Sequence, residues 1–513
     1  DHGMVLESLA HIKDWIDDLI EDILGDVLDN NDEIRRLYIL IDLALTSLKG
    51  MYEDDIFEHG FNSINHLDFR DWLRKHGANE EFTVQSAPVR AVYDLVFAYV
   101  DGDINKASFE AGTCLRGALR MVFCYEGGIM WKMQAGMGDV VFTPIYQVLK
   151  ERGVTFKYFN KVEELIPDPT DPTRISEIKI TEQVQLNSGP NHYHPLVNVK
   201  GLACWPSEPL YDQIIEKQAD LLQANNVNLE SSWSNWPEIY ENAYGKPLPQ
   251  HTLKVGVDFD KIIFGLSLGS VPVVCPKLLP LSPKLQDCVD NVKIVATQAF
   301  QIWQKPSLEE MGWTPIPESG EEPVLTSFTE PLDTWASMDQ LLCREVWPDT
   351  EVQPKNASYF CGAQPITEFP PFSDHSFPAK CKGVVKENAI NLLDNHIRSL
   401  WPSSESDSNG FKWEWLIAPD NEQGVARFDA QYWRSNIDPS ERYVQSVVNS
   451  SKYRLKTDET GFSNLYITGD WITNGMNAGC VEGAVQAGLT TSRAISGHPK
   501  IIKGENEFMD DNK

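Results

Sequence analysis

The stretch Leu465-Tyr466-Ile467-Thr468-Gly469-Asp470-Trp471, continued by Gly475-Met476-Asn477-Ala478-Gly479-Cys480-Val481-Glu482-Gly483-Ala484, decides the fold. Its apolar start predicts a short strand that ends in Gly-Asp, and its small residues lead into a helix predicted over 481–495. This unit suits a bound cofactor. A carboxylate at a strand end accepts hydrogen bonds from ribityl or ribose hydroxyls, glycines admit close backbone approach, and free helix-start amides favour negative charge. On spacing alone, a structural unit with a capping Asp470 fits as well.

Two further blocks come earlier in the chain. Gln134-Ala135-Gly136-Met137-Gly138 precedes a helix predicted over 140–152, a strand predicted over 154–159 and the segment Lys161-Val162-Glu163-Glu164-Leu165. Phe259-Asp260-Lys261-Ile262-Ile263-Phe264 predicts another strand. In this order the three blocks resemble the flavin amine oxidase and phytoene desaturase superfamily of FAD-dependent oxidoreductases, over roughly a third of the chain.

The resemblance implies FAD as the cofactor and assigns roles to particular residues. Asp470 would bind the ribityl chain, and the amide of Val481 would face the flavin O2 atom and stabilise charge on the reduced ring. Val162 would contact adenine through its backbone. The residues assigned to the cofactor are Val162, Gly469, Asp470, Gly479, Cys480, Val481, Glu482, Gly483 and Ala484.

The implied reaction is hydride removal from an organic, hydrophobic or amine substrate, by an oxidase, a desaturase or a redox-neutral isomerase. Cys480 stands where amine oxidases often carry an aromatic cage residue, which argues against simple amine oxidation. A helix-start thiol can have a lowered pKa, but we expect Cys480 to be a small packed thiol. The pattern identifies no catalytic base.

The dinucleotide-binding start of the family is missing from these residues. Gly136-Met137-Gly138 begins like a G-x-G-x-x-G turn, but Val141 stands at the third glycine. We therefore expect a second polypeptide to supply that turn, or a lost N-terminal portion, since Met4 is internal.

The expected fold class is α/β, with a Rossmann-like FAD domain built from discontinuous segments and interleaved with a mixed α+β substrate domain. Residues 1–129 are predicted to be a mainly helical part of the substrate domain, and 130–284 part of the FAD domain with a β-meander. Residues 285–458 are predicted to be the mixed substrate domain, 459–497 the C-terminal FAD-binding segment and 498–513 a tail.

Composition limits the partners and the compartment. The 513 residues carry a formal net charge of -31, which argues against nucleic acid or an anionic membrane as a partner. No apolar run is long enough for a transmembrane segment. The start shows no secretory signal and the nine cysteines form no CxxC pair, so we expect a cytoplasmic protein with reduced thiols.

Two other functions fit parts of the sequence. Gly265-Leu266-Ser267-Leu268-Gly269 follows a predicted strand like the nucleophile elbow of a serine hydrolase, although Pro272 and Pro276 argue against a helix directly after it. Alternatively, the chain is a non-catalytic remnant of the flavoprotein fold that acts as a binding subunit. His192-Tyr193-His194 lacks a third ligand at suitable spacing, so we predict no metal site.

Overall fold

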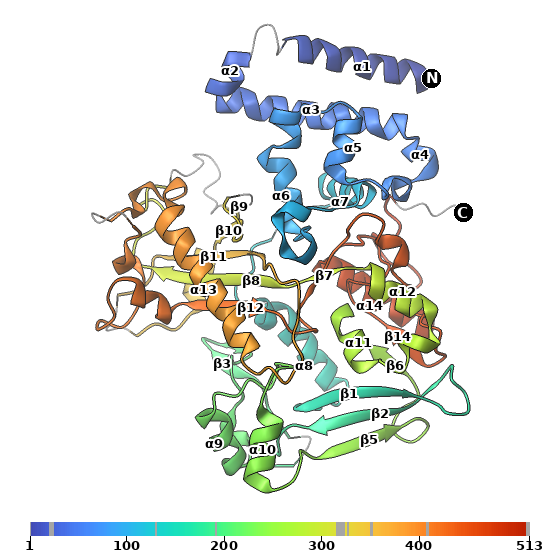
Figure 1. Cartoon of the computed structure of the whole chain (residues 1–513), viewed down its shortest axis with the longest axis vertical. Helices are drawn as coiled ribbons and strands as arrows, with labels where there is room; N and C mark the ends of the chain where they lie inside the picture. The colour runs from blue at the N-terminus through green and yellow to red at the C-terminus, as the bar shows by residue number, and fades with distance from the viewer. Residues whose placement is uncertain are drawn as a thin grey trace.

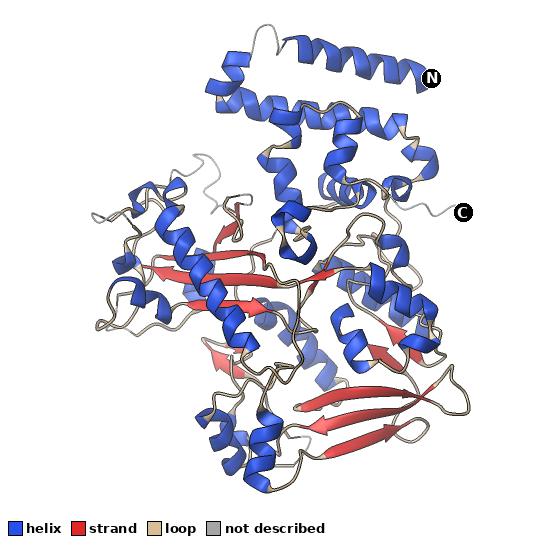
Figure 2. Ribbon diagram, in the orientation of Figure 1, coloured by secondary structure: helices blue, strands red, loops and turns tan. Residues whose placement is uncertain are grey.

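The computed structural model describes residues 2–19, 25–128, 131–189, 192–313, 324–325, 328–348, 352–406 and 410–508. Within these ranges, helices are mixed with five small sheets (Figures 1 and 2). The helices are α1 (His2–Leu19), α2 (Gly25–Asn30), α3 (Asp32–Glu53), α4 (Ile56–His59), α5 (Phe69–Lys75), α6 (Ala87–Leu95), α7 (Ala111–Phe123), α8 (Thr143–Glu151), α9 (Glu216–Ala224), α10 (Trp236–Tyr244), α11 (Val271–Val274), α12 (Pro283–Asn291), α13 (Phe377–Asn395) and α14 (Val481–Ser496). The strands are β1 (Asn160–Pro167), β2 (Ile175–Glu182), β3 (Val197–Val199), β4 (Leu202–Cys204), β5 (Gln250–Lys254), β6 (Ile262–Phe264), β7 (Ile294–Val295), β8 (Thr297–Gln304), β9 (Val324–Leu325), β10 (Thr334–Ser337), β11 (Asn356–Ala363), β12 (Tyr432–Asn436), β13 (Tyr443–Val444) and β14 (Leu465–Ile467).

The first seven helices form one unit at the N-terminal end of the chain (Figure 1). Helix α3 begins where the side chain of Asn31 accepts hydrogen bonds from the amides of Glu33 and Ile34, which satisfies two unpaired helix-start donors. A buried ion pair of 2.5 Å between Lys13 and Asp42 ties α1 to α3. The helical pattern predicted for this part of the sequence is therefore confirmed within the described residues.

Helix α7 packs closely against the short 3-10 helix η2 (Phe61–Ile64). A Cβ atom on Gly112 would lie 1.8 Å from the carbonyl oxygen of Phe61, so only glycine fits at this crossing. This contact explains the small residues at the start of the helix. Two arginines of the same helix, Arg116 and Arg120, are each only 1% exposed.

The middle of the chain forms a three-stranded antiparallel sheet in the order β1-β2-β5. Its apolar face shares one core with the separate parallel pair β6–β14, through Leu165 and Ile175 on one side and Phe264 and Ile467 on the other. The pair β6–β14 is the one parallel strand pair in the described part of the chain. A Rossmann sheet is not seen there.

The strand predicted over 154–159 is wrong. The residues before β1 pair with no described strand, and β1 itself begins at Asn160. A strand exists through its ladder of hydrogen bonds, so an apolar, β-branched segment without a neighbouring strand is merely extended chain.

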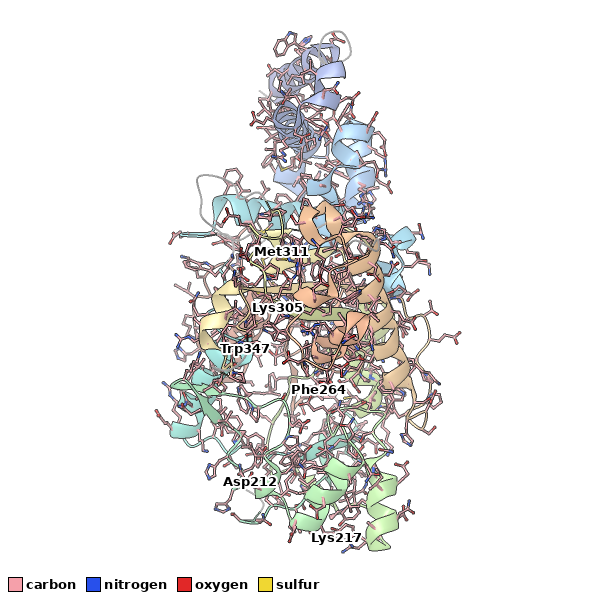
Figure 3. The ribbon with its side chains drawn as sticks, turned by 90° about the vertical axis from the view of Figure 1, so that its left-hand side faces the viewer. Asp212, Lys217, Phe264, Lys305, Met311 and Trp347 are labelled. Atoms are coloured by element: carbon pink, nitrogen blue, oxygen red, sulfur yellow. The ribbon has the colours of Figure 1, made fainter. Side chains whose placement is uncertain are left out.

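A five-stranded antiparallel sheet, in the order β12-β8-β11-β10-β9, forms the largest sheet. Helix α13 crosses it (Figure 1), and an aromatic core that includes Phe300, Phe360, Trp335 and Trp401 fills the space around it. In the side view, Met311 and Lys305 lie above Phe264, while Asp212 and Lys217 lie below it (Figure 3). Figure 1 shows this sheet between the helical unit and the β1-β2-β5 sheet.

None of the described helices combines the length and apolar character that crossing a bilayer requires. In the predicted tail, residues 498–502 are irregular and 503–508 form turns, and 509–513 lie outside the described residues.

Three carboxylates meet where α6 contacts the segment before β10. Oxygen atoms of Asp94, Glu330 and Asp333 lie within 4.8 Å of one another, with Arg90 paired to Glu330 and Tyr99 donating to Asp94. Burial and the two neighbouring carboxylates raise the pKa of Asp333 to about 9. Like charges this close cannot all ionise in a buried site, so Asp333 holds a proton at neutral pH.

Asp333→Asn should therefore increase the free energy of unfolding at pH 8, by about 1–4 kcal/mol. The folded pKa lies above the unfolded value of about 4, so this group's stabilisation is complete below about pH 4 and is lost as pH rises towards 9. Asn keeps an oxygen that can accept the 2.9 Å bond from Thr334. Urea unfolding of the two proteins between pH 5 and pH 9 measures the difference.

Asp374→Asn is the control with the opposite sign. A hydrogen bond from Ser376 lowers the pKa of Asp374, so its contribution is present at neutral pH and is lost on acidification. If the free energies of unfolding of wild type and Asp333→Asn differ by the same amount at every pH from 5 to 9, Asp333 does not hold a proton at neutral pH.

Candidate functional site

The parallel pair β6–β14 ends at Gly469-Asp470. Strand β14 pairs with β6 through Leu465–Ile467 against Ile262–Phe264, and the amide of Thr468 extends this ladder to the carbonyl of Phe264 at 3.0 Å. Gly469 has φ of +128°, a conformation that favours glycine, and it turns the chain out of the strand. The sequence prediction of a strand that ends in Gly-Asp is confirmed.

Asp470 is half-buried just beyond the strand end. Its main-chain oxygen accepts 2.7 Å and 3.2 Å bonds from Arg454 and Asn474, but among the described residues no side chain donates to its carboxylate. Burial raises the pKa of Asp470, and the nearby Arg454 opposes that shift. The backbone amides of Asp470 and Trp471 bond to this carboxylate, whose oxygens can accept further hydrogen bonds from a ligand.

The loop between Asp470 and α14 is fixed by side chains. Asn474 accepts bonds of 2.9 Å from the amides of Met476 and Asn477, and Gln486 of α14 accepts one of 2.9 Å from Gly475. Tyr443 donates to the carbonyl of Gly479. Because its backbone groups are already bonded, this loop is a preorganised surface and not an open segment.

Two loop glycines are required by contacts within the protein. A Cβ atom on Gly479 would lie 2.4 Å from the ring of Tyr443, and one on Gly475 would lie 2.6 Å from Gln486. Both glycines let neighbouring side chains reach the loop backbone. Close approach to a ligand is therefore not the reason that these two positions need glycine.

The first residue of helix α14, Val481, has a backbone amide that is available to a ligand. Cys480 is its N-cap and accepts a 3.3 Å hydrogen bond from the amide of Gly483, while the amide of Ala484 donates to the carbonyl of Cys480. For the amide of Val481, no acceptor is found among the described residues. Burial raises the pKa of Cys480, in agreement with a packed thiol and against an activated one.

The side chain of Glu482 is bound by the protein itself. It accepts a 2.6 Å bond from Arg120 and a bond from Tyr125. Glu482 therefore offers only its backbone to a ligand, and its carboxylate instead attaches α14 to α7.

The buried arginines of α7 were not anticipated from the sequence. Arg116 donates to the carbonyl of Met476 at 3.4 Å, and Arg120 bonds the carbonyls of Gly475 and Gly504 at 3.4 Å and 2.5 Å. Their four-residue spacing on a helix rich in small residues is the available signal, because such residues face the same way. Their acceptors lie about 360 positions away, beyond any local pattern.

The other predicted positions lie elsewhere. Val162 is on β1, where it packs against the core that includes β14. Ser267 donates a 2.6 Å bond to the carbonyl of Pro439, and none of the hydrogen bonds found among the described residues joins it to a histidine. The expected absence of a helix after Ser267 is wrong: the 3-10 turn Leu268–Ser270 and then α11 follow directly, because Pro272 occupies the first turn, where a missing amide costs little.

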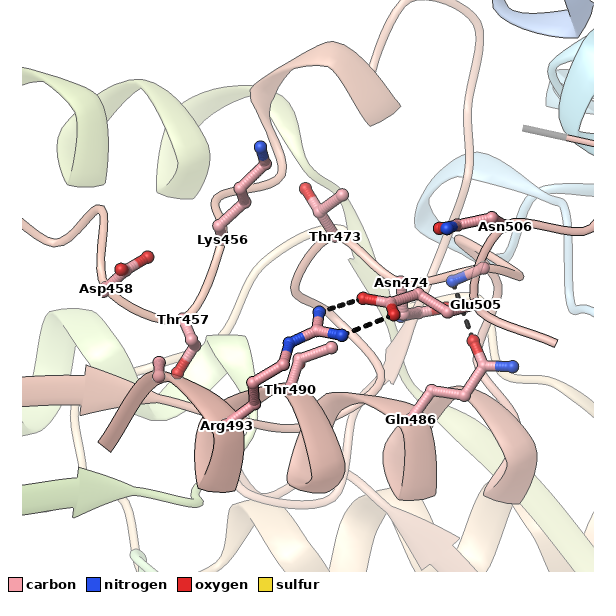
Figure 4. Close-up of a pocket in the computed structure, with 12 residues that line it drawn as sticks. Lys456, Thr457, Asp458, Thr473, Asn474, Gln486, Thr490, Arg493, Glu505 and Asn506 are labelled. Atoms are coloured by element: carbon pink, nitrogen blue, oxygen red, sulfur yellow. Dashed lines mark hydrogen bonds and ion pairs between the residues drawn. The ribbon is translucent and has the colours of Figure 1, made fainter. Parts of the chain in front are cut away.

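A cavity of about 350 Å³ lies beside α14, behind the loop (Figure 4). Polar side chains in its wall bond to one another or to the protein backbone. Arg493 pairs with Glu505 at 2.7 Å, and Gln486 is bonded to Gly475. This cavity offers little that a ligand would complete.

No protein-family model matches the chain, and no curated protein matches it. Among solved structures it is similar to an oxidoreductase from Methanosarcina mazei, with 12% sequence identity and a TM-score of 0.41, over 84% of this chain and 68% of that chain. A similarity this low carries no argument about fold or function.

Arg120→Ala should lower the free energy of unfolding by about 2–4 kcal/mol, because it removes three bonds and leaves Glu482 without its cation. Arg493→Ala is a matched control on α14: it breaks a more exposed ion pair with Glu505, which should cost no more than about 1 kcal/mol. Urea unfolding measures both variants. Equal losses of unfolding free energy in the two variants would show that the buried bonds of Arg120 stabilise the fold no more than an exposed ion pair does.

Proposed function

We propose that this protein is an FAD-dependent oxidoreductase. One observation carries the proposal: the loop between β14 and α14 presents the half-buried Asp470 carboxylate, to which no described side chain donates, and the Val481 amide, which has no acceptor among the described residues. The loop is otherwise fixed by its own hydrogen bonds. A flavin with ribityl hydroxyls and a ring carbonyl would complete both groups.

FAD, when bound, would accept the hydride taken from the substrate. Asp470 would accept a hydrogen bond from a ribityl hydroxyl. The Val481 amide, at the positive end of α14, would donate to a ring carbonyl and favour negative charge on the ring. The substrate would be an organic, hydrophobic or amine molecule. Cys480 next to this amide presents no aromatic face to hold an ammonium group.

We further propose that a second polypeptide completes the β6–β14 sheet. The outer edge of β14 is covered: the amide of Ile467 bonds the carbonyl of Thr457 at 3.0 Å, and Thr460 bonds Leu465. The outer edge of β6 pairs with no described strand, and Ile263 is 56% exposed there. Parallel sheets are normally buried on both sides, so this edge calls for another strand.

An apolar stripe on α14 supports the same proposal. Val481, Val485 and Leu489 recur at four-residue spacing and are 48%, 55% and 37% exposed. Exposed apolar stripes of this kind mark contact surfaces. The second polypeptide would place a parallel strand beside β6 and a helix on this stripe, and its Gly-rich turn would supply amides for the FAD pyrophosphate.

Asp470→Ala should weaken FAD binding by about 1.5–3 kcal/mol, because it removes a charged acceptor from the ribityl chain. The fold should survive, since the carboxylate has no side-chain partner to lose. Fluorescence titration of the flavin-depleted native assembly measures the affinity. Asp458→Ala, which removes an exposed carboxylate, is the control; equal affinity in all three proteins would exclude Asp470 from the site.

Val485→Asp should weaken association with the second polypeptide by roughly tenfold or more, because it places a charge in an apolar contact. Val425→Asp, at a valine that is 46% exposed elsewhere, should leave association unchanged. Native mass spectrometry of complexes isolated from the natural source measures the stoichiometry. An FAD-loaded, active species that contains only these 513 residues would contradict the proposal.

A further inference from the structure

A second cavity, of about 420 Å³, lies on the side of the loop that faces the helical unit. Four separate parts of the chain line it: the η2 region near Asn62, Glu110 at the start of α7, the segment from Asn449 to Arg454, and the loop residues Thr473 and Asn477. Its wall is mostly polar. A polar cavity built from distant segments is a candidate binding site, provided that its polar groups are not already satisfied by the protein.

The polar groups at the floor of this cavity already have hydrogen-bond partners within the protein. Glu110 is completely buried, and its carboxylate accepts bonds of 2.8 Å from the amide of Ser451 and from the hydroxyl of Thr113. Asn65 donates to the hydroxyls of Thr113 and Ser451 and accepts from the amide of Thr113. These groups form a closed network that holds the walls together and leaves little for a ligand.

The walls, in contrast, carry donors without acceptors. Asn477 is 4% exposed, and its side-chain oxygen accepts from the amide of Asn474, but its amide nitrogen has no acceptor among the described residues. The side chains of Asn449 and Lys452, both exposed, also have no hydrogen-bond acceptor among the described residues, and the Lys452 ammonium group lies 5.2 Å from the centre of the Tyr453 ring. Both asparagines have positive φ, of 50° and 65°, a strained conformation that persists where the surroundings impose it.

Two cationic side chains, Arg454 and Lys452, line the cavity. Arg454, only 4% exposed, lines it and has an Nε atom with no partner. Arg454 interacts with two buried carboxylates, Glu110 and Asp470, and the exposed Lys452 adds a second cation to the cavity. The unpaired donors of this cavity fit an oxygen-rich anion.

We propose that this cavity binds a small organic oxyanion, a carboxylate or a phosphate ester, through Lys452, Asn449 and Asn477. The cavity is larger than the anionic group itself, so it has room for the carbon skeleton of the molecule. The proposal does not depend on a bound flavin, because none of these three residues is assigned to the cofactor.

Calorimetric titration of the native protein with inorganic phosphate and, separately, with succinate tests the site, at constant ionic strength and with chloride as the reference anion. We expect saturable binding of at least one of the two oxyanions and none of chloride; the tighter of the two identifies the ligand as a phosphate ester or a carboxylate. Lys452→Glu should weaken that binding by about tenfold or more, because it replaces an attractive charge with a repulsive one.

Lys456→Glu is the matched control, since this exposed lysine lines the cavity on the other side of the loop. It should bind the oxyanion like the wild type. The site is disproved if neither oxyanion saturates, or if both lysine variants lose binding equally. Flavin content, measured on the same preparations by absorption, reports on the proposed cofactor separately.

Discussion

The parallel pairing of β6 with β14 is the constraint on which the rest of the candidate site depends. It brings two segments 200 positions apart to one edge and places Gly469-Asp470 at the end of the pair. One side of this pair is closed by Thr457, Thr460 and α14, whereas the other ends at an exposed Ile263. A two-stranded parallel sheet with one open edge is not a complete structural unit.

The loop that follows the pair is rigid because distant side chains satisfy its backbone. Tyr443, Gln486 and the two buried arginines of α7 bond to carbonyls and amides within ten residues of Asp470. The glycines at 475 and 479 make these contacts possible by leaving room for the side chains. The Asp470 carboxylate, which has no side-chain donor, and the amide of Val481 are therefore presented in a fixed geometry. Fixed, unpaired groups recognise a ligand at a small entropic cost.

The sequence was sufficient where the signal is local. Strand β14 and the helix after it were predicted from apolar spacing and small residues, and the structure has them at Leu465–Ile467 and Val481–Ser496. The strand expected at 154–159 fails because pairing depends on a neighbour that composition cannot reveal. The roles of Arg120, Tyr443 and Arg454 were also out of reach, since each is defined by a partner far along the chain or by burial. The carboxyl cluster at Asp333 likewise joins residues about 240 positions apart.

The central claim is that the assembly containing this chain holds FAD in the loop between β14 and α14. The visible absorption spectrum of the native assembly, isolated with all of its natural partners, tests that claim most directly. The account predicts the bands of a bound flavin, with FAD released on denaturation. A colourless assembly that takes up no FAD with every natural partner present would contradict it.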